Sequence, residues 1–179
     1  GGGRGVKIIN DLTSQAAYVQ GMLRHNAAFT KELDELVEAK AKEAKTEKGR
    51  VARGAKILHC GTIRNVTIGV HAYVHGSQFL ENGTINSCIE HPTEVGEGVQ
   101  AKSFILSEGA RVESGAVLDK AFVGQGVKMG KQYSAENSLF FANCEAFHGE
   151  AVSLFGGPYT VTHHKSTLLI AGLFSFYNA

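Results

Sequence analysis

Two adjacent histidines near the end of the chain, His163 and His164, are the residues best suited to acid–base chemistry. They follow the segment 155–159 (FGGPY), whose Gly-Gly-Pro run predicts a turn that breaks regular structure and can form the wall of a pocket. An imidazole has an unperturbed pKa of about 6.5, so it can take up a proton near neutral pH. Successive strand residues point to opposite faces, so we expect only one ring to meet a substrate. The competing interpretation is one buried, hydrogen-bonded ring beside an ordinary surface histidine. The neighbours expected to contact a substrate are Tyr159, Lys165 and Ser166.

A second group of polar side chains, His71, Tyr73 and His75, alternates with Ala72 and Val74. Alternation places the three polar side chains together on the outer face of a strand. Two histidines four residues apart on a strand lie ~13 Å apart, which is too far to share one metal unless a corner folds them together. The spacing therefore favours a polar face or a contact between subunits, and we expect no metal site.

The three cysteines give little sign of chemistry. Cys144 lies close to His148, but it falls in a column of small inward residues, whereas a reactive thiolate needs exposure. Cys60 and Cys88 lie in or beside the apolar pattern, and no CxxC spacing is present. The cysteines are therefore predicted to be small buried hydrophobes in a reducing compartment, which favours a cytoplasmic location.

These residues must be positioned by a repeat that places an apolar side chain every five or six residues from 57 to 140, in a unit of seventeen. A helix would need apolar spacings of three and four, and a simple strand would alternate, whereas five or six describes a short segment followed by a corner. Three segments of roughly 17 to 20 Å close a triangular coil. The repeat predicts an all-β solenoid, a parallel β-helix. Its best stretch is Val95, Ala101, Leu106, Val112, Leu118, Val123, Met129, Ala135 and Phe140.

Residues seventeen apart are expected to stack in columns. One outer column should place Lys102 over Asp119, a rung of opposite charges. Near the start of the regular stretch, the step from Ile85 to Ile89 is only four residues, and the period does not place it. The two columns expected side by side are Cys88, Ile105, Phe122 and Leu139, and Ile89, Leu106, Val123 and Phe140, with Leu106, Val123 and Phe140 pointing inward.

Two copies of the repeat, 68–74 (IGVHAYV) and 95–101 (VGEGVQA), resemble the hexapeptide repeats of left-handed β-helix proteins. That superfamily contains trimeric acyltransferases and the C-terminal domains of sugar-nucleotide pyrophosphorylases. The stretches 84–87 (TINS), 92–99 and 163–171 make the chain similar to a family of large bacterial hexapeptide-repeat proteins of unknown function. The resemblance spans about residues 50 to 179. It implies the left hand of the helix, which spacing alone does not set.

The resemblance also implies a function. In acyltransferases of this superfamily a histidine near a subunit boundary commonly serves as general base. By analogy, His163 or His164 would do so here, with acyl-CoA or a nucleotide sugar as substrate, no tightly bound cofactor, and a homo-oligomer, most simply a trimer. The alternative is a non-catalytic β-helix module that oligomerises or regulates a larger protein, as the pyrophosphorylase domains do.

Residues 1–49 do not follow the apolar repeat of the β-helix. An amphipathic pattern predicts one helix that starts near Asp11, and a charge-rich helix should run from about Thr30 to Lys48 and end at Gly49. Such a helix is usually a solvated face, and the alternative is an arm that binds a partner or packs in a trimer. We expect a helical segment over 1–49, an insertion or a linker, and a β-helix over 50–179 that further protein continues beyond its open last coil.

Composition excludes several classes of function. Lys and Arg number 18 against 17 Asp and Glu, for a formal charge of +1. No basic cluster with interleaved aromatic residues is present, so we expect no nucleic-acid partner. No run of eighteen apolar residues is present either, so we expect no membrane span.

Overall fold

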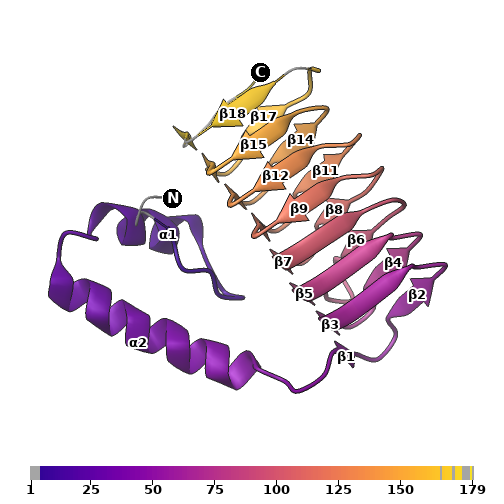
Figure 1. Ribbon diagram of the computed structural model, residues 1–179, viewed down its shortest axis with the longest axis horizontal. Helices are drawn as coiled ribbons and strands as arrows, with labels where there is room; N and C mark the ends of the chain where they lie inside the picture. Colours follow the sequence, from indigo (N-terminus) through magenta and orange to yellow (C-terminus); the bar gives the residue numbers. More distant parts are fainter. Residues whose placement is uncertain (1–4, 166, 171, 175–177, 179) are drawn as a thin grey trace. The chain divides into compact units, whose positions relative to one another are not determined.

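The computed structural model describes residues 5–165, 167–170, 172–174 and 178, and the chain divides into two units after Glu47. The second unit is an all-parallel β-solenoid of about seven turns (Figure 1). The predicted parallel β-helix is therefore confirmed. Each coil buries its apolar row against the coils before and after it, which is why a short repeat suffices to build the unit.

The first unit contains two helices, α1 (Ser14–Met22) and α2 (Ala27–Ala44). The predicted start of the first helix at Asp11 is wrong, because the Thr13 hydroxyl is the N-cap and accepts a hydrogen bond from the backbone N–H of Ala16 at 3.2 Å. The second helix, by contrast, begins earlier than predicted, because the Asn26 side chain caps it. It ends before Lys48, since Lys45 already has extended backbone angles. In the described part of the chain, neither helix is long and apolar enough to cross a bilayer.

Two parallel sheets form the sides of the solenoid. Among the described residues one sheet has seven strands, which are β2 (Lys56–Leu58), β4 (Tyr73–His75), β6 (Glu94–Val95), β8 (Arg111–Val112), β11 (Lys128–Gly130), β14 (Glu145–Phe147) and β17 (Val161–Thr162). The other has twelve and covers two sides, because its longest strands continue around a corner. These strands are β1 (Arg50–Val51), β3 (Thr62–Ile68), β5 (Phe79–Ile85), β7 (Gln100–Leu106), β9 (Val117–Asp119), β10 (Phe122–Val123), β12 (Ser134–Glu136), β13 (Leu139–Phe140), β15 (Glu150–Val152), β16 (Phe155–Gly156), β18 (Leu168–Ile170) and β19 (Leu173–Phe174).

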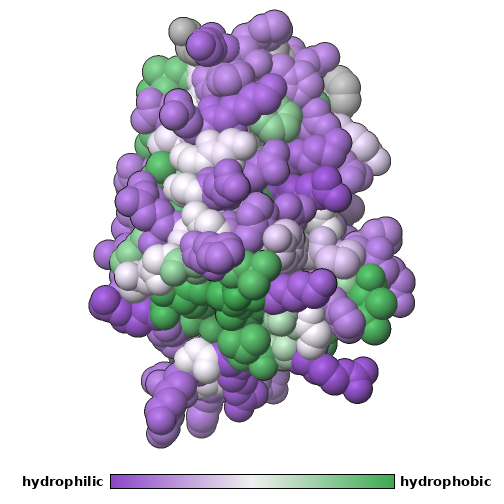
Figure 2. Space-filling view, turned by 90° about the vertical axis from the view of Figure 1, so that its right-hand side faces the viewer, coloured by the Kyte–Doolittle hydropathy of each residue, from purple (hydrophilic) through white to green (hydrophobic). Residues whose placement is uncertain are grey.

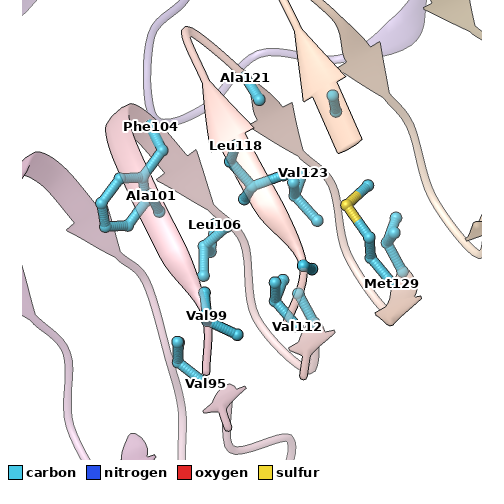
Figure 3. Close-up of a cluster of buried hydrophobic side chains, with 14 of the residues drawn as sticks. Val95, Val99, Ala101, Phe104, Leu106, Val112, Leu118, Ala121, Val123 and Met129 are labelled. Atoms are coloured by element: carbon cyan, nitrogen blue, oxygen red, sulfur yellow. The ribbon is translucent and has the colours of Figure 1, made fainter. Parts of the chain in front are cut away.

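The core is the column structure that the period predicts. Val123 pairs with Leu106 on one side and with Phe140 on the other, and the exposed fraction of each of the three is 1% or less. Figure 3 shows Leu106 and Val123 among the inward side chains of neighbouring coils. Full burial of one such side chain contributes about 1.5 to 3 kcal/mol.

The predicted extension of these columns to Cys88 and Ile89 is wrong. Ile85, not Ile89, pairs with Leu106, and the residue before it, Thr84, continues the neighbouring column. The two strands lie 21 residues apart in sequence, because Ile85 is the partner of Leu106. Four extra residues therefore leave the coil as a loop, which explains the four-residue step in the pattern.

The loop over residues 86–93 is tied to the coil by Thr93. Its hydroxyl donates to the carbonyl of Asn86 at 2.7 Å and accepts from the backbone N–H of Gly109 at 3.1 Å. Thr93 is fully buried, whereas Ile89 in the middle of the loop is 61% exposed. Hydrogen bonds at the base of the loop thus keep the stacking in register on both sides of the insertion.

Each coil turns at three corners, where the backbone takes positive φ. Glycine and asparagine suit this conformation best, which explains their recurrence. At one of these corners, which we call the third corner, stacked side chains also form hydrogen bonds between coils. Asn65 Nδ2 donates to Asn82 Oδ1 there at 2.8 Å. The third-corner residues are Asn65, Asn82, Ser103, Lys120, Asn137 and Ser153.

Lys120 is the third-corner residue least suited to its backbone, with φ of 51°. We expect Lys120→Asn to raise the free energy of unfolding by up to about 1 kcal/mol, because asparagine tolerates the left-handed region. Thermal unfolding followed by circular dichroism measures the change. Lys120→Ala is the control, since it shortens the side chain without relieving the backbone. A lower melting temperature for Lys120→Asn than for Lys120→Ala would contradict the argument.

The outer column predicted to pair charges has the expected register. Lys102 lies opposite Asp119, but Asp119 Oδ1 is buried and has no hydrogen-bond partner within the described residues. The ion pair in this column forms two coils earlier, between Arg64 and Glu81 at 3.1 Å. Register alone therefore did not determine which rung carries the ion pair.

Candidate functional site

The outer face of the seven-stranded sheet carries two columns of side chains, and we call it the charged face. Inward residues of this sheet such as Val74 and Met129 are buried, so the residues on either side of them along each strand point outward. Figure 2 looks onto the side on which β2, β4 and β6 are drawn in Figure 1; the upper part of this surface is largely hydrophilic, and a hydrophobic patch lies in its lower part. The first column is Lys56, Tyr73, Glu94, Arg111, Lys128 and Glu145, and the second is Leu58, His75, Gly96, Glu113, Gly130 and Phe147.

His163 follows β17 and lies at the end of the second column. Its Nε2 donates to Glu145 Oε2 at 2.7 Å, and its ring packs at 5.4 Å from the ring of Phe147. The other oxygen of Glu145 accepts from Lys128 Nζ at 3.0 Å. The His163 side chain is 47% exposed, so an oriented imidazole faces solvent.

The Glu145 carboxylate is held in its charged form. Hydrogen bonds from Lys128 and then from His163 lower its pKa, against a smaller opposing effect of desolvation. Because the folded-state pKa of Glu145 is lowered, the ionised carboxylate stabilises the fold. This stabilisation is present above the unfolded-state pKa of about 4.3 and is lost as the pH falls through the folded-state value. A carboxylate only accepts, so Nε2 of a neutral His163 carries the proton and Nδ1 is the basic atom.

The other predicted site residues do not converge on His163. Tyr159 occupies the corner before β17 with φ of 62°, at the opposite end of that short strand. His164 and Lys165 are exposed in the turn that follows, where the His164 carbonyl accepts from the Thr167 hydroxyl at 2.9 Å. Ser166 lies outside the described residues.

The competing interpretation with one buried ring is wrong, because both histidines are exposed in the turn after β17, where strand alternation does not apply. That only one of them meets a substrate stays a prediction. The expectation that the Gly-Gly-Pro run breaks the regular coil is wrong as well. Tyr159 sits at an ordinary corner, one coil after Asn143, and the Thr160 hydroxyl closes the corner by donating to the Gly157 carbonyl at 2.8 Å.

A second histidine–carboxylate pair lies on the charged face at earlier coils, on β4 and β6. His75 Nε2 bonds Glu94 Oε1 at 3.1 Å, and Arg111 Nε lies 3.8 Å from the other oxygen of Glu94. The Tyr73 ring stacks on His75 at 4.5 Å, which confirms that the two side chains share a face. His71 does not join them, because it occupies a corner with φ of 56°. The His75 side chain is 25% exposed, less than that of His163.

The predicted inward position of Cys144 is confirmed. Its side chain is fully buried, its thiol donates to the Gly157 carbonyl at 3.1 Å, and burial raises its pKa to about 11. The neighbouring candidate His148 lies at a corner with φ of 58°. Within the part of the chain that the structure describes, no cluster of His, Cys, Asp and Glu has the arrangement of a metal site.

Sequence reasoning missed the partners of His163. Glu145, Lys128 and Phe147 come from the two preceding coils and carry no local motif. Counting back one coil from His163 would have found two of them, because Glu145 and Phe147 lie 18 and 16 residues earlier in the printed sequence.

One curated relative is an "Uncharacterized protein" of Treponema pallidum (strain Nichols). It is 34% identical over 64 residues, which is 36% of this chain and 9% of the relative. The chain therefore matches a small fraction of that longer protein. The model of the family described as "Domain of unknown function (DUF4954)" matches residues 1–179. The solenoid with its charged face thus belongs to a chain that is a member of the DUF4954 family.

Proposed function

We propose that this chain is a transferase-like hexapeptide-repeat protein, left-handed in its coil, in which His163 is the general base. One observation carries the proposal, the 2.7 Å hydrogen bond from His163 Nε2 to Glu145 on a half-exposed imidazole. A carboxylate that fixes the tautomer leaves Nδ1 free to accept a proton, and it stabilises the imidazolium that results.

The chemistry is transfer of an acyl group from a thioester to a hydroxyl or amine. Nδ1 of His163 takes the proton of the acceptor while the oxygen or nitrogen of the acceptor attacks the acyl carbon. The carbon–sulfur bond then breaks, and the leaving thiolate takes a proton from the imidazolium. Glu145 is a positioning residue, and Lys128 holds its carboxylate by donating a hydrogen bond to Oε1, the oxygen that His163 does not contact. A nucleotide sugar is the second donor class for the same base.

Acetyl-CoA is the probe for this function. We expect it to bind the protein in calorimetry and to release thiol in the presence of an acceptor amine or hydroxyl. His163→Ala should lower turnover by ~10² to 10⁴, the usual size of a general-base contribution, and should leave the fold intact. UDP-N-acetylglucosamine is the second donor to be tested in the same way.

His164→Ala is the matched control, because it removes an exposed imidazole one residue away and should keep full turnover. Glu145→Gln tests the positioning role, since loss of the carboxylate should lower kcat and leave KM nearly unchanged. Equal turnover of His163→Ala and the unaltered protein would reject His163 as the base. Absence of binding and turnover with both donors would reject the transferase.

The alternative function is a non-catalytic module that assembles copies or positions a larger protein. The run of paired charges on the charged face favours it, because Glu94 and Glu145 each contact a histidine and a cation. A polar face of this kind suits a specific protein contact as well as a substrate. Retained assembly with no turnover is the expected result for this alternative.

A further inference from the structure

The order of charges along the first column of the charged face is unusual. From β2 to β14 it is positive, aromatic, negative, positive, positive, negative. Arg111 and Lys128 are register neighbours, so two like charges lie next to each other within one column. Their side chains are 63% and 56% exposed, so each can still reach a partner.

This order is complementary to itself when it is reversed. A two-fold axis that runs along the strand direction between β6 and β8 keeps the column opposite itself and reverses the order of coils. Lys56 then faces Glu145 of the second copy, and Glu94 faces Arg111. Tyr73 faces Lys128, a cation–π pair. The symmetry doubles each pair, so all six members of the column find a suitable partner.

The second column fits the same axis by size. Leu58, which is 45% exposed, faces Phe147 of the second copy, so an apolar side chain meets an aromatic ring. The bulky His75 and Glu113 face glycines, Gly130 and Gly96 respectively. Gly96 has little room for a side chain within its own chain either, because a Cβ there would lie 3.0 Å from Cβ of Glu113 on the next coil.

We infer that the charged face binds a second copy of this chain, antiparallel, through β2, β4, β6, β8, β11 and β14. The inference does not rest on the proposed function. His163 follows β17, the next coil, and β17 has no counterpart in the reversed alignment. Its imidazole therefore stays outside the six paired coils.

A parallel arrangement centred on the first column is disfavoured. A two-fold axis along the solenoid that passes through this column would place Arg111 opposite Arg111 of the second copy, and Lys128 opposite Lys128. Two like charges 4 Å apart repel by about 1 kcal/mol in water and by about 4 kcal/mol at a partly desolvated surface.

The area that the interface buries sets the expected affinity of the dimer. Six coils spaced ~4.8 Å apart and one side roughly 17 Å wide give roughly 500 Å² per copy, near the lower limit for a specific interface. We therefore expect a dimer that dissociates at micromolar concentrations and more readily at high salt, because screening weakens partly exposed ion pairs.

The test uses two complementary charge reversals, Glu94→Arg and Arg111→Glu, with mass measured by sedimentation equilibrium. Either variant alone brings like charges together at the two-fold axis, so each should be monomeric. In an equimolar mixture, the arginine introduced at position 94 faces the glutamate introduced at position 111, and the native Arg111 faces the native Glu94. The mixture should therefore recover the dimer, with at least a tenfold gain in affinity over either variant alone.

Glu136→Arg is the matched control, because it makes the same charge change on β12 in the other sheet and should leave the dimer intact. Circular dichroism melting checks that each variant is folded. A monomeric or trimeric unaltered chain, a dimer that survives both single reversals, or a mixture that stays monomeric would each overturn the interface.

Discussion

Val123→Asp is expected to lower the melting temperature of the solenoid unit by about 10 °C or more, which corresponds to a loss of about 4 kcal/mol. Val123 is fully buried between Leu106 and Phe140 of the adjoining coils. A carboxylate there loses its hydration without gaining a partner, and it also removes the apolar contact with both neighbours.

The matched control is Val117→Asp on β9, the strand that precedes β10 in the sequence. Val117 is 41% exposed on the outer side, so the same chemical change should cost less than about 0.5 kcal/mol. Urea unfolding followed by circular dichroism gives both values. Equal losses for the two variants would mean that Val123 does not face the axial core.

Gly61→Ala is expected to cost about 3 kcal/mol, although Gly61 does not need positive φ. A Cβ at this position would lie within van der Waals overlap of the Gln78 carbonyl oxygen on the next coil. The backbone N–H of Gly61 also donates to the Ser77 carbonyl at 2.8 Å, so the two coils cannot separate without losing that hydrogen bond. The substitution therefore forces the stacking apart.

Gly115→Ala is the informative comparison. Gly115 has φ of 72°, but a Cβ there would lie 3.6 Å from the nearest atom, in Gln132, so only the backbone penalty of about 1 kcal/mol applies. Midpoints of urea unfolding for both variants test the ranking. If Gly115→Ala is the more harmful change, backbone conformation and not the approach of coils limits these positions.

The axial core could be predicted because its period survives in the sequence, but the exact coil lengths could not. Val123 and Phe140 keep the seventeen-residue step, whereas Ile85 lies 21 residues before its partner Leu106. The added residues form a loop whose attachment depends on buried hydrogen bonds of Thr93, and no local pattern reports those bonds.

The buried ring of Tyr133 shows the same limit. Tyr133 is fully buried and packs edge-on against Phe140 at 6.0 Å. It fits because the next coil has Gly149 at this level, where a Cβ would lie 2.9 Å from the ring. That coil is one residue shorter than the repeat, since Ser134 pairs with Glu150. A fixed step of seventeen would have placed Glu150 beside the ring.

The candidate site was predictable only in part. The pair His163 and His164 could be named from residue type and from the resemblance, because imidazole chemistry is visible in a sequence, but the sequence did not choose between them. The dependence of His163 on Glu145 could not be predicted, because the pairing crosses from one coil to the previous one. The helix ends were misjudged because Asp11 and Thr13 are both good N-cap residues, and only the bond to Ala16 distinguishes them.

The loop over residues 86–93 makes the solenoid a natural host for grafted peptides. The coils on both sides keep their register although four extra residues leave the wall between them, so this point already tolerates added length. Because closing a longer loop costs only about 0.6 kcal/mol per doubling, an epitope or an affinity tag inserted beside the exposed Ile89 would be displayed on a rigid support. Evolution has the same opportunity to add a new binding loop without rebuilding the core.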